Sequence, residues 1–414
     1  MTIFQLDHAF FDQLAGVERK KYVHEIKMIK YLYVSGPHSS ADICKHLKIS
    51  APNAISMLND LVEKGFIEKK GRGVSIGGRK PDLYGVQVDC FYVMAVEIGI
   101  YKTRMAIYNS VNENLTGVKD FFVTIDNKAE TMDSIITAIQ QFIEQSGVNT
   151  QRLTGIGISM PGLVDSIKGI SHTYFEFGEK HLLDLLKEKL QKPVFIENDA
   201  RAIALAEYLL RLEKSKKDVL VLNLDWGIGL GMILNGKLYQ GVSGFAGEFG
   251  HIPMLEDGPL CRCGKLGCLE TVASGTAVVQ MAEEGIASGK SSILLNKKES
   301  RQTEIDVKDV VDAALSGDQY AIGIFAEVGK NLGKGISILI QLFNPELIVL
   351  SGRMAEAGQY LMTPIQQSLQ THTMNQLNRE TRIELSELGQ NIGMMGALAV
   401  VKDHVFETFI KRAV

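Results

Sequence analysis

Residues 243–270 read SGFAGEFGHIPMLEDGPLCRCGKLGCLE, a stretch that holds one histidine and three of the five cysteines of the chain. Such crowding in a chain of 414 residues is typical of a metal site rather than of a disulfide framework. Three thiolates and one imidazole complete the tetrahedral ligand set of structural zinc, with no position open for the water that a catalytic zinc needs. Ordinary core thiols are the alternative. The stretch therefore predicts one structural zinc per chain, bound by His251, Cys261, Cys263 and Cys268.

Two continuous apolar runs flank this stretch. Residues 219–224 read VLVLNL and residues 347–352 read LIVLSG, and both lead into glycine-bearing turns. Such runs are typical of buried strands in an α/β sheet, so we expect both to lie centrally in one sheet. Residues 284–306 are polar with little periodicity and predict a surface loop or helical excursion. Residues 389–409 predict a terminal helix that returns to a first lobe.

The composition is that of an ordinary globular protein. Hydrophobic residues make up 45% and charged residues 22% of the chain, which excludes disorder and collagen-like structure. No apolar run reaches the roughly 18 residues of a membrane span, and the N-terminus lacks the basic-then-apolar layout of a signal peptide. We therefore expect a soluble, cytoplasmic protein without membrane insertion.

The net charge of −4 conceals an uneven distribution. Residues 1–86 carry 13 Lys plus Arg against 9 Asp plus Glu, a balance of +4 that leaves −8 for the rest of the chain. A basic segment by itself indicates nucleic acid only weakly, because solvated lysines are common on any surface. The pattern within the segment has to decide.

Three short helices are predicted within this basic segment. The first covers residues 19–33 and stops at Gly36 and Pro37, and Ser39 and Ser40 can cap the start of the second. A tight turn leads into a third helix with Pro52 in its first turn, where no backbone donor is needed. The third helix is predicted to bury Ile55, Leu58, Leu61 and Val62 and to point Asn53, Ser56, Met57 and Asn59 outward. Two short helices joined by a tight turn are typical of a DNA-reading unit.

A glycine-rich hairpin is expected to follow the helices as a wing. Its predicted strands are residues 66–70 and 74–76, with a turn at 71–73 and a basic tail at 77–81. Glycines let the backbone approach a phosphate closely, and basic side chains suit a narrow, A·T-rich minor groove. A helical interaction module with a solvated hairpin is the alternative. The residues predicted to contact DNA are Pro52, Asn53, Ser56, Met57, Arg72, Arg79 and Lys80.

Several motifs resemble one known family. The segment AGEFGH at 246–251, followed by C-x-C-G-x-x-G-C-x-E at 261–270, resembles the signature of the ROK family of repressors, open reading frames and sugar kinases. The segment ENDA at 197–200 is similar to the family's catalytic-aspartate motif, and residues 156–162 to its strand and turn near the sugar. The helices in front, including SAP at 50–52, resemble the repressor branch, so the resemblance covers nearly the whole chain.

The resemblance implies a fold with three parts. The expected fold class is α/β, with an actin-like (ribonuclease H-like) two-lobed sugar kinase fold behind a winged helix-turn-helix domain. We expect the DNA-binding domain at 1–87 and the first lobe at 88–200, together with a C-terminal helix at about 389–414. The second lobe is expected at 201–388 and carries the zinc motif.

The resemblance also implies a sugar between the lobes. The implied contacts are Asn198, Asp199, Glu248, His251 and Glu270. Carboxylates, an amide and an imidazole suit sugar hydroxyls, which both donate and accept hydrogen bonds. His251 would serve twice, with one ring nitrogen on the metal and the other toward the sugar. Helix capping or surface solvation is the alternative for Asn198, Asp199 and Glu248.

The segments that bind ATP in kinases of this family depart from the family pattern. Where kinases read D-x-G-G-T-K the chain reads EIGIYK at 97–102, and where they read G-T-G-x-G-G-G it reads DWGIGLG at 225–231. The adenosine-side turn, usually two glycines, is SGR at 351–353. Lost space, a lost hydroxyl and added negative charge all oppose phosphate binding. Asp199, the general base of a kinase, is therefore expected to be vestigial.

Together these features predict a sugar-responsive transcriptional regulator without kinase activity, a repressor of carbohydrate uptake or catabolism genes. It is expected to bind operator DNA as a homodimer or homotetramer, and a sugar or sugar phosphate as its effector. The alternative is an ATP-dependent sugar kinase, glucokinase-like or N-acetylhexosamine kinase-like, with an N-terminal helix-turn-helix. The sequence leaves open which sugar acts, whether it releases or promotes DNA binding, and whether a protein partner replaces it.

Overall fold

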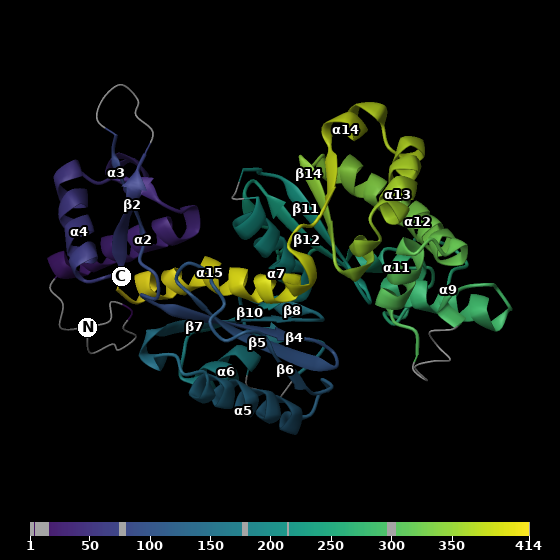
Figure 1. Ribbon diagram of the computed structural model, residues 1–414, viewed down its shortest axis with the longest axis horizontal. Helices are drawn as coiled ribbons and strands as arrows, with labels where there is room; N and C mark the ends of the chain where they lie inside the picture. The colour runs from purple at the N-terminus through teal and green to yellow at the C-terminus, as the bar shows by residue number, and fades with distance from the viewer. Residues whose placement is uncertain are drawn as a thin grey trace. The chain divides into compact units, whose positions relative to one another are not determined.

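The computed structural model describes residues 4, 16–73, 80–175, 181–212, 215–295 and 304–413. The chain divides into two compact units, coloured along the sequence in Figure 1. The first unit is Met1–Asn198 with Met394–Val414, and the second is Asp199–Gly393. Each unit contains one five-stranded sheet. None of the helices in these described ranges combines the length and apolar character that crossing a membrane requires.

The first unit begins with the three predicted helices, α2 (Gly16–Ser35), α3 (Ser40–Leu47) and α4 (Ala51–Glu63). Ser39 caps α3, because its hydroxyl accepts the N–H of Asp42 at 3.2 Å and the Asp42 carboxylate accepts the N–H of Ser39 at 3.2 Å. This reciprocal pair satisfies two backbone donors at the start of the helix. An antiparallel sheet in the order β1–β3–β2 lies beside the helices and consists of β1 (His38–Ser39), β2 (Ile67–Arg72) and β3 (Asp82–Val86).

The buried face of α4 differs from the prediction. Its buried side chains are those of Ala54, Met57, Leu58 and Leu61. Ile55 is 48% exposed and Val62 is 37% exposed, so the prediction that these two point inward and Met57 outward is wrong. The buried positions follow helical spacing from the small Ala54. The prediction started the stripe one residue too late because it followed the larger apolar side chain.

The wing hairpin also differs from the prediction. The turn expected at 71–73 is wrong, because β2 continues to Arg72, which pairs with Asp82 of β3. The strand that pairs with β2 is β3, whereas the strand predicted at 74–76 lies outside the described residues. A bulge between Lys69 and Gly71 interrupts the ladder, and Gly71 supplies the positive φ of 118°. Arg79 and the other residues of 74–79 lie outside the described residues, so the tip of the wing stays a prediction.

The sheet of the first unit has the strand order β10–β7–β4–β5–β6. β4, β7 and β10 run parallel, and β4, β5 and β6 run antiparallel. Ile135 and Leu186 come from helices and join Met94 and Ile156 of the sheet in one buried core. The bounds are β4 (Tyr92–Ile98), β5 (Lys102–Asn109), β6 (Lys119–Phe122), α5 (Ala129–Gln145), η1 (Thr150–Arg152), β7 (Leu153–Met160), β8 (Val164–Asp165), β9 (Ile170–Ser171), α6 (Leu182–Leu190) and β10 (Val194–Asn198).

The sheet of the second unit has the order β13–β12–β11–β14–β15. The two predicted apolar strands are β11 and β14, which pair in parallel inside this sheet, so that prediction is confirmed. The strand bounds are β11 (Val219–Leu224), β12 (Ile228–Leu234), β13 (Lys237–Leu238), β14 (Leu347–Ser351) and β15 (Arg382–Leu385). The helical bounds are α7 (Asp199–Ala206), η2 (Glu207–Arg211), η3 (Phe249–His251), α8 (Glu270–Ala273), α9 (Gly275–Ala287), α11 (Val307–Leu315), α12 (Gln319–Phe343), η4 (Arg353–Ala357), α13 (Gln359–His372), α14 (Asn375–Glu380) and η5 (Gly389–Asn391).

The C-terminal helix α15 (Ile392–Ala413), yellow in Figure 1, belongs to the first unit from Met394 onward. It lies directly on β7, because Gly155 and Gly157 carry no side chains there. A Cβ added at Gly157 would stand 2.2 Å from the Ala397 carbonyl oxygen, and one at Gly155 would stand 3.1 Å from Val405. The contact at Gly157 excludes a larger residue unless the backbone moves, and a Cβ at Gly155 would require the Val405 side chain to shift.

Helices α2, α3 and α4 with the sheet β1–β3–β2 form the helical domain, and this domain contacts α15 within the first unit. Lys402 is buried, donates to the Tyr33 carbonyl oxygen at 2.9 Å, and lies 4.1 Å from the centre of the Tyr33 ring. Lys30 pairs with Glu407 at 2.6 Å. α2, which carries Lys30 and Tyr33, is therefore held by the C-terminal helix as well as by the chain that connects it.

Candidate metal centre and ligand site

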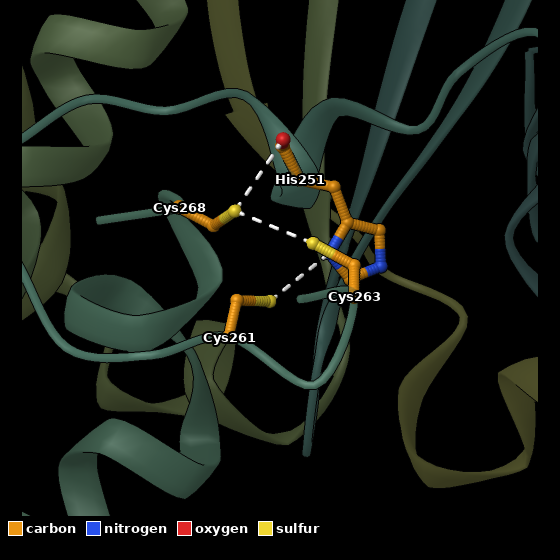
Figure 2. A group of neighbouring side chains, drawn as sticks. All are labelled: His251, Cys261, Cys263 and Cys268. Carbon is orange, nitrogen blue, oxygen red and sulfur yellow. Dashed lines mark hydrogen bonds between the residues drawn. The ribbon is translucent and has the colours of Figure 1, made fainter. Parts of the chain in front are cut away.

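The four predicted metal ligands come together (Figure 2). Their nitrogen and sulfur atoms all lie within 4.8 Å of one another. The Sγ atoms of Cys263 and Cys268 are 3.6 Å apart, and the Sγ of Cys261 lies 3.4 Å from Nδ1 of His251. In a tetrahedral site with Zn–S bonds of about 2.3 Å, neighbouring sulfurs lie about 3.8 Å apart. The donor types and their spacing therefore fit a bound metal ion.

The local backbone explains why these residues meet. His251 ends η3, and Cys268 stands just before α8. An isolated β-bridge pairs Pro253 with Cys268, which brings the two ends of the motif together. Gly267 has a φ of 64°, and a Cβ there would stand 1.8 Å from the Leu255 carbonyl oxygen, so only glycine allows this crossing of the chain.

Two thiols of the cluster respond to their surroundings in opposite directions. Burial, together with the neighbouring thiols, raises the pKa of Cys268 to about 12. A hydrogen bond from the backbone N–H of Lys265 lowers the pKa of the exposed Cys263. Metals bind the thiolate form, so a cation in the cluster would favour ionisation of all three cysteines and release protons on binding.

The first candidate ligand residue, Asp199, is placed by glycines of β12. A Cβ added at Gly229 would stand 2.5 Å from Cβ of Ala200, and one at Gly231 would stand 2.4 Å from Cβ of Ala204. α7 therefore lies directly on β12, and Asp199 begins this helix. These glycines belong to the segment that resembles a phosphate-binding turn, but here they make room for a helix.

The loop that carries Glu248 passes the backbone of the same strand. Gly247 has a φ of 100°, and a Cβ there would stand 2.2 Å from the carbonyl oxygen of Leu230. The carboxylate of Glu248 lies 3.9 Å from Nε2 of His251, whose Nδ1 faces Cys261. The two nitrogens of His251 thus face different partners, one toward the metal cluster and one toward a candidate ligand residue.

Glu270 begins α8, and its side chain is only 11% exposed. Its Oε2 accepts the backbone N–H of Ile228 at 3.2 Å. Arg262 reaches both oxygens, with Nε 3.1 Å from Oε1 and Nη2 3.3 Å from Oε2. The sequence analysis missed Arg262. Its place between two cysteine ligands is a signal that it is near the metal, but no linear pattern reveals the contact with Glu270.

Asn198 is the one predicted sugar contact that lies in the first unit. It ends β10, and its amide donates to the Gly162 carbonyl oxygen at 3.1 Å. Its own N–H is accepted by Glu197 at 2.8 Å. The second unit therefore gathers Asp199, Glu248, His251 and Glu270 around β12, and the first unit holds Asn198 at the end of its edge strand.

The turn between β11 and β12 is filled by side chains that bind one another. Nε of Arg353 lies 2.9 Å from the Asp225 carboxylate, and Nη1 lies 3.0 Å from that of Asp306. The guanidinium also stands 5.1 Å from the centre of the Trp226 ring, a cation–π arrangement. Three departures from the kinase pattern, Asp225, Trp226 and Arg353, therefore form one cluster. In the sequence they appear as separate changes.

The predicted DNA contacts divide into three groups. Pro52, Asn53 and Ser56 are exposed on α4, and Arg72 and Lys80 are exposed at the base of the wing. Met57 is buried, so its predicted outward position is wrong. Arg79 lies outside the described residues.

The family model named "ROK family" matches residues 93–404, and the chain belongs to this family. It is 27% identical to the DNA-binding transcriptional dual regulator NagC of Escherichia coli strain K12 over 394 residues, which are 94% of this chain and 95% of NagC. It is 28% identical to the xylose repressor of Bacillus subtilis strain 168 over 392 residues, 94% of this chain and 97% of that protein.

Solved structures of the family show the same fold. A ROK family transcriptional regulator, a homologue of the E. coli MLC protein, superposes with a TM-score of 0.79 at 26% identity, covering 95% of this chain and 99% of that chain. A ROK family glucokinase from Streptomyces griseus, in complex with glucose and AMPPNP, gives a TM-score of 0.64 at 28% identity, covering 74% of this chain and 97% of that one. The predicted α/β, actin-like fold class is confirmed.

Proposed function

We propose that the chain is a sugar-responsive transcriptional repressor without kinase activity. The observation that carries this proposal is the extent of the likeness. The match to a transcriptional regulator covers 95% of the chain and includes the N-terminal helices, whereas the match to a glucokinase covers 74%. Relatives similar over nearly their whole length include an N-acetylglucosamine repressor and xylose repressors.

The DNA-binding part of the proposal is a winged helix-turn-helix domain at 1–87. α4 offers Pro52, Asn53 and Ser56 to base edges, while Arg72, Arg79 and Lys80 of the wing bind phosphates or the minor groove. One small domain contacts few bases, so tight operator binding needs a homodimer or homotetramer. Because the proposed target is DNA, the proposed location is the cytoplasm.

The effector part of the proposal is a sugar or sugar phosphate bound by Asn198, Asp199, Glu248, His251 and Glu270. The carboxylates beside β12 suit a sugar, because a carboxylate accepts strong hydrogen bonds from hydroxyl groups. The cluster of Arg353 with Asp225 and Trp226 supports the absence of phosphoryl transfer, because a carboxylate and an indole fill the turn that resembles a phosphate loop. Asp199 then contributes to binding and not to catalysis.

The metal part of the proposal is one structural zinc on His251, Cys261, Cys263 and Cys268. All four positions would be protein ligands, so the ion would crosslink the loop and leave no site for an activated water. The residues beside it then stay oriented: His251 is fixed through one nitrogen and presents the other toward Glu248.

A thermal-shift screen of monosaccharides and sugar phosphates, combined with gel shifts on the protein's own upstream DNA, tests the proposal. We expect one sugar class to stabilise the protein, the Glu248→Ala variant to lose that response, and the sugar to change operator affinity about 5- to 150-fold. If the protein bound no DNA even at low salt, the proposal that it is a transcriptional regulator would be wrong. Sugar-dependent ATP turnover that is lost in Asp199→Asn would establish the kinase instead.

A further inference from the structure

We propose that Arg262 is a positioning residue that couples metal binding to the ligand site by holding Glu270. The proposal rests on the proposed sugar site for its biological use. Its physical basis is independent of the sugar and lies in contacts among Arg262, Glu270 and the turn at Gly227.

The first step is the position of Arg262 in the chain. It stands between Cys261 and Cys263, so each of its peptide bonds leads to a metal ligand. When both sulfurs bind one ion, the backbone between them is fixed at both ends. Backbone hydrogen bonds from Gly264 to Cys261, at 2.9 Å, and from Cys261 to Lys265, at 2.8 Å, close the turn around Arg262, and bonds from both sulfurs to one ion would fix that turn further.

The second step is the contact with Glu270. The guanidinium approaches both carboxylate oxygens, at 3.1 and 3.3 Å, and the Ile228 N–H approaches Oε2 at 3.2 Å. A Cβ at Gly227 would stand 2.6 Å from this Oε2 and 3.4 Å from Nη2 of Arg262. The carboxylate is therefore wedged between the metal loop and the first residues of β12, and its orientation depends on Arg262.

The third step separates positioning from stability. The Arg262 side chain is 66% exposed, and exposed ion pairs add little to folding because water screens them and long side chains lose freedom. Arg262 therefore matters through the direction it gives Glu270.

The chain carries its own reporter of this contact. Trp226 is the single tryptophan and directly precedes Gly227, where an added Cβ would meet the side chains of Glu270 and Arg262. Its carbonyl oxygen accepts the N–H of Thr276 at 3.1 Å, so the turn is anchored on one side. Loss of the Arg262–Glu270 contact would release the other side and change the surroundings of the indole.

The test compares Arg262→Ala and Arg262→Lys with the wild type by Trp226 fluorescence, while zinc is removed with excess EDTA and then restored. Lys168→Ala is the matched control, because Lys168 is 65% exposed and pairs at 3.2 Å with the buried Asp165 in the first unit. Zinc content and circular dichroism are followed in parallel.

We expect zinc removal to shift the emission of the wild type and of Lys168→Ala, and zinc to restore it. Arg262→Ala should keep one zinc yet show emission that no longer responds to its removal. Arg262→Lys should respond in part, since an ammonium cannot contact both oxygens in the same way. For any sugar found in the screen, Arg262→Ala should bind about tenfold more weakly at unchanged zinc content, because Glu270 loses a charged hydrogen-bond partner.

Two results would overturn the coupling. One is a wild-type emission that stays constant while zinc leaves a folded protein, and the other is an Arg262→Ala variant that responds as the wild type does. A protein that shows the fluorescence coupling but binds neither sugar nor operator would contradict the proposed function and leave the role of Arg262 intact.

Discussion

The two sheets share one strand order but have different neighbours. In each, three antiparallel strands are followed by two parallel ones, and a helix lies directly on glycines of one strand. In the first unit α15 lies on Gly155 and Gly157 of β7, and in the second α7 lies on Gly229 and Gly231 of β12. In both units, glycines in a strand let a helix approach the sheet closely.

The difference lies in what each helix carries. α15 carries Lys402 and Glu407, which hold the helical domain, and α7 begins with Asp199 and packs on β12. A shared architecture therefore supports a proposed DNA side in the first unit and a proposed ligand side in the second. Fold and function separate here, because a scaffold fixes positions and the side chains at those positions decide the chemistry.

The largest effect is expected when the proposed zinc site of the second unit loses one of its ligands. Cys268→Ser should lose zinc and destabilise the second unit by more than about 3 kcal/mol, because closed metal sites couple binding to folding. Cys90→Ser is the matched control, since Cys90 is also buried but lies in the first unit outside the cluster. Elemental analysis and thermal unfolding measure both. Equal zinc content and equal midpoints in the two variants would contradict the metal site.

The next effect tests whether the glycine contacts are equivalent in the two units. Gly157→Ala and Gly229→Ala should each cost about 1–3 kcal/mol by overpacking. The loss should be larger at Gly157, whose new Cβ meets a backbone oxygen, than at Gly229, whose new Cβ meets a side-chain methyl.

Gly323→Ala is the control for these two variants, because nothing lies within 4 Å of a Cβ at this helical position. It should leave stability unchanged or raise it slightly. Urea unfolding measures all three. A cost at Gly323 as large as at Gly157 would show that loss of glycine, and not contact with a helix, determines the result.

A smaller effect tests the docking of the helical domain. Lys402→Met removes the donor to the Tyr33 carbonyl oxygen, and an unsatisfied buried acceptor costs about 1–3 kcal/mol, offset in part by the apolar replacement. Operator affinity should fall while the thermal shift produced by the sugar stays the same. A Lys402→Met protein with wild-type DNA affinity and a lost sugar response would reverse the assignment of the two sides.

The smallest effect on stability is expected at adjacent residues of α4. Ser56→Ala should change stability by less than about 0.5 kcal/mol because Ser56 is exposed, yet it should blunt the preference for operator over unrelated DNA. Met57→Ala should do the opposite and destabilise the domain, because Met57 is buried. Gel shifts with specific and competitor DNA, together with thermal melts, distinguish the two. Equal effects at both residues would contradict the observed face of α4.

The sequence alone determined features whose causes are local. The four candidate metal ligands lie in one short segment, so a metal site could be predicted before any fold was known. β11 and β14 are continuous apolar runs, and Ser39 and Pro52 mark helix starts by their own hydrogen-bonding properties. The resemblance of the motifs led to the family, because these motifs are themselves short and linear.

Only the tertiary structure decided features that depend on contacts between distant segments. The buried face of α4 includes the small Ala54, which the apolar pattern did not indicate. The strand that pairs with β2 begins ten residues beyond Arg72, at Asp82. Arg353 reaches Asp225, and Arg262 reaches Glu270. A linear pattern records which side chains exist, whereas the partner that each one finds depends on how the strands and loops pack. That is why the cluster of candidate metal ligands could be predicted and the contact between Arg262 and Glu270 could not.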